Sequence, residues 1–172
     1  MFRKSFYSLR AVIPAIFIFL LGGAVSFAQR VPPPEEVIGF KVGADYHLAT
    51  YQQAVEYFRA LERASPMIKL FEMGRTSMGK PMIYAVITSE ENMGKLERFK
   101  EISRKLSQAK GLTDQVAHRL AEEGRAVVYI DGGLHASECA PAQHNLQLAY
   151  DLLTSEDPNI SLIRDNTILL LV

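Results

Sequence analysis

The sequence predicts an α/β fold in which helices flank a mixed sheet. Two patterns predict it: a hairpin pattern in residues 67–88 and a strand, loop, helix and strand in residues 125–172. A hairpin pairs its strands antiparallel, whereas two strands joined through a helix usually form a right-handed parallel crossover. A single sheet that contains both units is therefore mixed.

Residues 1–28 have the composition of an export signal. Three basic residues precede an apolar stretch, and residues 26–28, Ser-Phe-Ala, have small residues at the first and third positions, as a cleavage site requires. Cleavage would leave 16 basic and 19 acidic residues, which predicts a secreted or periplasmic protein without stable membrane association. The alternative is an N-terminal membrane anchor, because residues 11–28 carry no charge and a span needs about 20 apolar residues.

The composition is that of one globular domain. The chain has 172 residues, of which 48% are hydrophobic, 19 are basic and 19 are acidic. A nucleic-acid-binding surface needs a basic excess, so we expect no nucleic-acid partner. The single cysteine, Cys139, excludes an internal disulfide.

The first predicted helix follows a proline-rich linker. Residues 29–46 contain three consecutive prolines, which favour an extended chain, so the domain is predicted to cover residues 47–172. From His47 to Ala64, apolar residues recur at spacings of three and four, as on one face of a helix. Ser65-Pro66 ends this helix.

A hairpin and two surface helices are predicted next. The apolar runs Met67–Met73 and Pro81–Thr88 flank a polar loop with two glycines, which is typical of an antiparallel hairpin. Residues 90–124 have helical spacing on either side of Gly111, with charges on the far face.

Two strands and a helix complete the chain. Val127–Ile130 is apolar on both faces, which predicts a buried inner strand. Pro141 suits the first turn of a helix that runs to Thr154. Thr167–Val172 is wholly apolar and predicts a second inner strand, after which we expect the sheet to be truncated.

The loop between the predicted strand Val127–Ile130 and the helix that runs to Thr154 carries a candidate zinc site. Residues 131–141 read Asp-Gly-Gly-Leu-His-Ala-Ser-Glu-Cys-Ala-Pro and place His135 and Glu138 at a strand end, where ligands collect in α/β sheets. Catalytic zinc takes three protein ligands, often imidazole and carboxylate groups. The alternative is structural: His135 caps the strand end, and the helix dipole favours a carboxylate at Glu138.

Two segments resemble the M14 zinc metallocarboxypeptidases. Residues 129–138, Tyr-Ile-Asp-Gly-Gly-Leu-His-Ala-Ser-Glu, resemble the zinc motif of that family, and residues 71–84 are similar to the hairpin that precedes it. Residues 165–172 are similar to the strand that leads to the substrate-binding loops. The resemblance spans about residues 47–172 and implies a zinc carboxypeptidase-like fold, bound Zn²⁺ and a peptide or protein substrate.

The resemblance assigns a role to two residues only: His135 and Glu138 match the first two zinc ligands. In the family the third ligand is a histidine, a glutamate is the general base, and arginines and an asparagine hold the substrate carboxylate. All of these are expected beyond Val172, so no catalytic residue is assigned in this fragment. We therefore expect the 172-residue chain by itself to be inactive and, with an uncovered apolar strand at residues 167–172, to fold poorly.

The sequence departs from the family at several positions. Many members have an arginine and an aromatic residue where this chain has Ser137 and Cys139. Cys139 is predicted to be a small, partly buried residue. Residues 90–124 are longer than the matching segment of the compact digestive enzymes, which implies a large bacterial secreted branch.

Three other histidines receive no ligand role. Six helical residues separate His144 from Glu138, which turns it toward another face, so it is predicted to be a surface or second-layer histidine. His47 and His118 fall on predicted helices. Two alternatives to a metallocarboxypeptidase stay open: a zinc deacylase of the aspartoacylase and succinylglutamate desuccinylase type, and a non-catalytic exported binding module.

Overall fold

The computed structural model describes residues 30–135 and 137–172, and the predicted export signal lies outside them. No helix in this described part is both long and apolar enough to span a membrane. Its helices and strands follow one another as α1 Pro34–Ile38, α2 Tyr51–Ala64, β1 Ile68–Arg75, β2 Pro81–Ile87, α3 Glu90–Gly94, α4 Leu96–Gln108, α5 Asp114–Glu123, β3 Ala126–Ile130, α6 Cys139–Thr154, α7 Pro158–Asn166 and β4 Thr167–Leu171.

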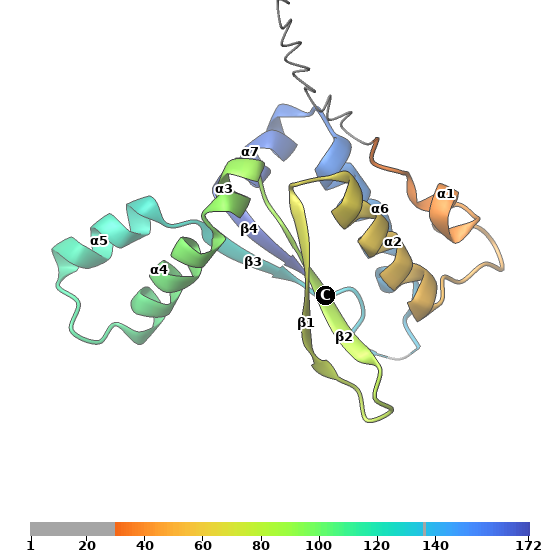
Figure 1. Ribbon diagram of the computed structural model, residues 1–172, viewed down its shortest axis with the longest axis horizontal. Helices are drawn as coiled ribbons and strands as arrows, with labels where there is room; N and C mark the ends of the chain where they lie inside the picture. The colour runs from red at the N-terminus through yellow and green to blue at the C-terminus, as the bar shows by residue number, and fades with distance from the viewer. Residues whose placement is uncertain (1–29, 136) are drawn as a thin grey trace, which may run out of the picture.

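The four described strands form one mixed sheet in the order β1-β2-β4-β3 (Figure 1). β1 pairs antiparallel with β2, β2 pairs antiparallel with β4, and β3 pairs parallel with β4. The α/β fold class, the hairpin and the parallel crossover are thereby confirmed. β4 is an inner strand, as predicted.

Helices cover both faces of the two inner strands. Ala85 and Ile87 of β2 join a core with α2 and α6, whereas Val86, which points to the opposite face, joins a core with α4 and α5. β4 alternates in the same way, with Leu169 on the first face and Ile168 on the second. The apolar sequence of both strands follows from this burial on two sides.

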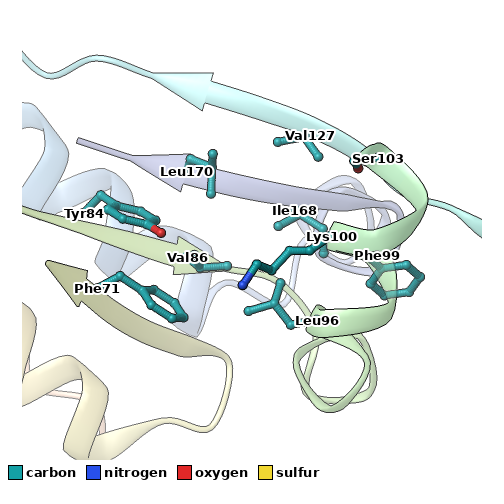
Figure 2. A pocket seen from close by; sticks show the side chains of 10 residues that line it. All are labelled: Phe71, Tyr84, Val86, Leu96, Phe99, Lys100, Ser103, Val127, Ile168 and Leu170. Atoms are coloured by element: carbon teal, nitrogen blue, oxygen red, sulfur yellow. The ribbon is translucent and has the colours of Figure 1, made fainter. Parts of the chain in front are cut away.

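The expectation that Val127–Ile130 is a buried inner strand is wrong. In the described chain β3 is an edge strand that pairs with β4 alone, and Val127, Val128 and Tyr129 are 50%, 39% and 60% exposed. The β-branched and aromatic residues predict the strand itself, but its burial depends on which elements pack against it. An apolar hollow of about 370 Å³ lies between α4 and the sheet. Figure 2 shows Val127 among the side chains that line it.

The first predicted helix begins four residues later than expected. Thr50 is its N-cap: the Thr50 side chain accepts a hydrogen bond from the Gln53 backbone, and the Gln53 side chain accepts one from the Thr50 backbone. This capping box begins α2 at Tyr51. Within the predicted linker, residues 34–38 form the short helix α1, and its Ile38 is buried in the core beside α2.

The predicted pair of surface helices is present as α4 and α5, preceded by the short α3. Arg98 on α4 donates two hydrogen bonds of 2.6 Å to the carboxylate of Glu123 on α5. These groups are exposed, so the pair orients the two helices more than it stabilises them. Phe99, Ile102 and Leu120 supply the buried contact beneath.

A buried polar cluster fixes α3 against the start of β4. The Asn92 side chain is 2% exposed, and its amide nitrogen donates to the carbonyl of Asp165 at 2.8 Å and to Thr88 Oγ1 at 3.2 Å. Thr88 Oγ1 lies 2.7 Å from the Thr167 carbonyl. Because buried polar groups are costly when unpaired, each member of this cluster depends on the others.

Asn92→Leu is therefore expected to lower the free energy of unfolding by about 1–3 kcal/mol, since it removes these donors and leaves buried acceptors short of partners. The shift in the urea midpoint at unchanged slope measures the loss. Asn159→Leu is the matched control, because Asn159 is exposed on α7. Equal midpoints for the two variants would contradict a stabilising role of the cluster.

Candidate metal site

The loop after β3 is held at the end of the sheet by backbone hydrogen bonds. The Val172 N–H donates to the Ile130 carbonyl at 3.0 Å, and the Gly132 N–H donates to the Val172 carbonyl at 2.9 Å. These bonds extend the parallel pairing of β3 and β4 beyond the strands themselves. The chain then turns through Gly133 toward α6.

Both positions of this turn require glycine, for different reasons. Gly133 has φ of 144°, which side chains disfavour, and its N–H donates to Asp131 Oδ1 at 3.0 Å. At Gly132 an added Cβ would lie 1.8 Å from the side-chain nitrogen of Asn145 on α6. The close packing of this loop against α6 therefore depends on a residue without a side chain at position 132.

His135 and Glu138 face each other across the following turn. His135 Nδ1 lies 2.6 Å from Glu138 Oε1, and the His135 N–H donates to Glu138 Oε2 at 3.3 Å. The Glu138 N–H in turn donates to the His135 carbonyl at 3.0 Å. Glu138 is the N-cap residue of α6, yet its side chain makes no cap hydrogen bond. The carboxylate is thus directed to the histidine.

The electrostatics of the pair favour an ionised carboxylate. The hydrogen bond from the His135 side chain, followed by that from the His135 backbone, holds the pKa of Glu138 below its ordinary value. Both side chains remain accessible, at 69% and 41% exposure for His135 and Glu138. A cation approaching from solvent would therefore meet a charged carboxylate.

The donor set and geometry of the pair fit two positions of a zinc site. Zinc takes imidazole nitrogen and carboxylate oxygen at about 2.0–2.2 Å, so two tetrahedral ligands lie about 3.3 Å apart. The 2.6 Å separation between His135 Nδ1 and Glu138 Oε1 would need to widen by less than 1 Å to reach that value. Residues 30–135 and 137–172 contain no group of three or more His, Cys, Asp or Glu residues that could hold a metal. The pair is thus an incomplete coordination sphere.

Cys139 is exposed, so its predicted partial burial is wrong. It is the first residue of α6, where it lines a hollow together with residues 42–48. The predicted helical position of His47 is also wrong, because α2 begins after it, at the Thr50 N-cap. His47 Nδ1 lies 2.8 Å from the Asp45 carbonyl oxygen, and the centroid of its ring lies 5.1 Å from that of Phe40. His118 lies on α5 and His144 on α6, both exposed.

Sequence reasoning missed Asn145, which links the loop to the end of β4. Asn145 is buried on α6, and its side-chain nitrogen donates to the Val172 carbonyl at 2.8 Å. Its Oδ1 has no hydrogen-bond partner among the described residues. Asn145 also lines a hollow of about 270 Å³, together with Gly132 and Gly133. An asparagine between apolar positions of a buried helical face was the available signal.

Comparison with known proteins agrees with the resemblance seen in the sequence. The family model of the zinc carboxypeptidases, Peptidase M14, matches residues 54–172. Among solved structures, the carboxypeptidase A of Helicoverpa armigera is similar at 14% sequence identity and a TM-score of 0.49. The match covers 81% of this chain and 29% of that carboxypeptidase. No curated protein sequence gives a significant match.

Proposed function

Because the chain belongs to the zinc carboxypeptidase family, Peptidase M14, we propose that it supplies two zinc ligands, His135 and Glu138, to a metallocarboxypeptidase. The observation that carries this proposal is the convergence of the two side chains, 2.6 Å apart, on a loop at the end of the sheet. The reaction would remove single residues from the C-termini of peptides or proteins.

Residues of this loop and of α6 would contribute to the zinc site in different ways. His135 would bind through an imidazole nitrogen and Glu138 through its carboxylate, which its low pKa keeps ionised. Gly132 and Asn145 would position the turn that brings both side chains to one side. Bound zinc would supply Lewis acidity and an activated water.

We further propose that the third ligand, the general base and the groups that hold the substrate carboxylate lie outside residues 30–172. Within the described residues the pair has no third partner suited to a metal. Residues 29–172 alone are accordingly expected to give no turnover.

The test uses the complete gene product that contains these residues, loaded with zinc. Peptides with free C-termini are expected to lose their last residue, whereas the same peptides with amidated C-termini are expected to remain intact. Mass spectrometry of the products distinguishes the two. Cleavage within both peptides would contradict an exopeptidase.

The same assay separates the two alternatives. N-acylated amino acids are the substrates to include for a zinc deacylase, and their hydrolysis without peptide cleavage would favour that activity. Zinc binding or peptide binding with no turnover of either substrate would favour a non-catalytic module. The hairpin β1–β2, whose sequence in residues 71–84 resembles the peptidase branch, supports the peptidase.

We also propose that the protein is exported, as a member of a bacterial secreted branch, and that residues 1–28 are removed. The basic, apolar and small-residue regions of that segment support cleavage after Ala28. Mass spectrometry of the exported protein is expected to find Gln29 as the first residue. An intact Met1 on a protein that resists carbonate extraction from membranes would instead establish an anchor.

A further inference from the structure

A groove with basic walls runs between helix α2 and the end of the β1–β2 hairpin, which lie side by side (Figure 1). Its volume of about 540 Å³ lies within the range of small-molecule sites, about 300–1,000 Å³. It shares no lining residue with the loop that carries His135 and Glu138. The residues that line it are Tyr51, Gln52, Val55, Glu56, Arg59, Arg63, Lys80 and Pro81.

Three cations and one anion face this groove. Arg59 and Arg63 come from α2, Lys80 comes from the hairpin, and Glu56 is the sole acidic residue of the lining. Among the residues that the structure describes, none of the three cations forms an ion pair or a side-chain hydrogen bond. The groove therefore carries a formal charge of +2 that protein groups leave uncompensated.

Three of the four basic residues of α4 behave differently, while the fourth, Arg104, forms no ion pair among the described residues. Arg98, Lys100 and Lys105 all pair with glutamates on the same helix or on α5. At the groove the one carboxylate of the lining, Glu56, forms no ion pair with Arg59, although it lies three residues before it on α2.

The two arginines of α2 are placed to share one anion. Arg59 and Arg63 are four residues apart on α2 and so occupy the same face, where like charges destabilise a helix. The Tyr51 hydroxyl donates to the Pro81 carbonyl, which ties α2 to the hairpin at the end of the groove where Lys80 lies. This hydrogen bond joins the two walls at that end of the groove.

From these charges and contacts we propose that the groove binds a phosphate group. Phosphate offers several acceptor oxygens and close to two negative charges at neutral pH, which matches the net charge of the groove. The planar guanidinium groups of Arg59 and Arg63 can each bind two of those oxygens, and Lys80 supplies a point charge from the opposite wall. A single carboxylate would need only one of these arginines.

A phosphate group can be free or carried on a lipid headgroup, and the experiment has an arm for each. Isothermal titration calorimetry of the complete protein measures binding of inorganic phosphate and pyrophosphate. Sedimentation with phosphatidylcholine vesicles, with and without phosphatidic acid, measures binding to lipid phosphate. A polyglutamate peptide serves as a polyanion that lacks phosphate.

The variant is Arg59→Gln with Arg63→Gln, and Lys80→Gln is a second variant on the other wall. The matched control is Arg104→Gln with Arg119→Gln, which removes the same charge from exposed arginines of α4 and α5. We expect the first variant to weaken phosphate binding by about tenfold or more, whereas the control changes it by less than about twofold. Glu56→Gln is expected to tighten binding, because it removes the one negative charge of the groove.

Saturable binding of inorganic phosphate or of phosphatidic acid vesicles, with the expected effects of the variants, supports the proposal. Which of the two binds shows whether the phosphate is free or carried on a lipid. Absence of binding in both arms overturns it, as does an equal loss in the groove variant and the control. Binding of polyglutamate in preference to phosphate also overturns it. None of these outcomes depends on peptide hydrolysis, so the phosphate site and the proposed peptidase fail or succeed separately.

Discussion

His135→Ala and Glu138→Gln are each expected to abolish peptide hydrolysis and to lower zinc affinity by more than about 100-fold. Even residues that only support a zinc ligand change affinity by about 10- to 100-fold, and removing a ligand itself leaves the coordination sphere incomplete. Metal content after dialysis, measured by mass spectrometry, gives the affinity loss independently of turnover.

His144→Ala is the matched control for this prediction. His144 is also exposed and lies on α6, six residues after Glu138. Its loss is expected to leave zinc content and hydrolysis within about twofold of the unaltered protein. A protein that kept metal and turnover without His135 or Glu138, yet lost them without His144, would show that the ligands are assigned to the wrong side chains.

Gly132→Ala is expected to lower the free energy of unfolding by about 1–3 kcal/mol or more and to weaken zinc binding with it. The new Cβ would lie 1.8 Å from Asn145 Nδ2, 2.5 Å from Asn145 Cγ and 2.9 Å from the Val172 carbonyl oxygen. Asn145 is buried and bonded to that same carbonyl, so a shift of its side chain away from the new Cβ would break this hydrogen bond. Chemical unfolding measures the first effect and zinc titration the second.

Gly94→Ala provides the comparison, because no atom lies within 4 Å of the Cβ that it would add and Gly94 ends helix α3. It is expected to be neutral or slightly stabilising, by at most about 1 kcal/mol. Asn145→Ala combined with Gly132→Ala should recover part of the loss, since it removes two of the three collisions. Additive losses in the double variant would mean that the collision is not the cause.

Much of the fold was predictable from local patterns. The helical spacing of residues 51–64, the two apolar runs around a glycine-containing loop and the apolar segment 167–172 each led to the element that is present. These features depend on periodicity within a short stretch of chain. The close pairing of His135 with Glu138 was predictable for the same reason, because both residues belong to one turn.

What sequence reasoning missed depends on distant parts of the chain. The exposure of Val127–Tyr129 follows from the lack of a described neighbour on the outer side of β3, which the strand's own composition does not encode. The requirement for Gly132 follows from Asn145, thirteen residues later and on the next helix. Ile38 joined the core although the preceding prolines favoured an extended linker.

The position of β4 between β2 and β3 also sets an order in which this sheet can assemble during synthesis. Ribosomes add about 5–20 residues per second, and domains begin to fold from their N-terminal side. The β1–β2 hairpin pairs over a short loop and can form as soon as it emerges, but Ala85–Ile87 and Ala126–Ile130 both wait for Thr167–Leu171. Some 80 residues must be translated after β2 before β4 is complete, and during that time the β2 edge of the hairpin has no partner strand. The nascent chain is then most exposed to chaperones and to pairing with another copy of itself.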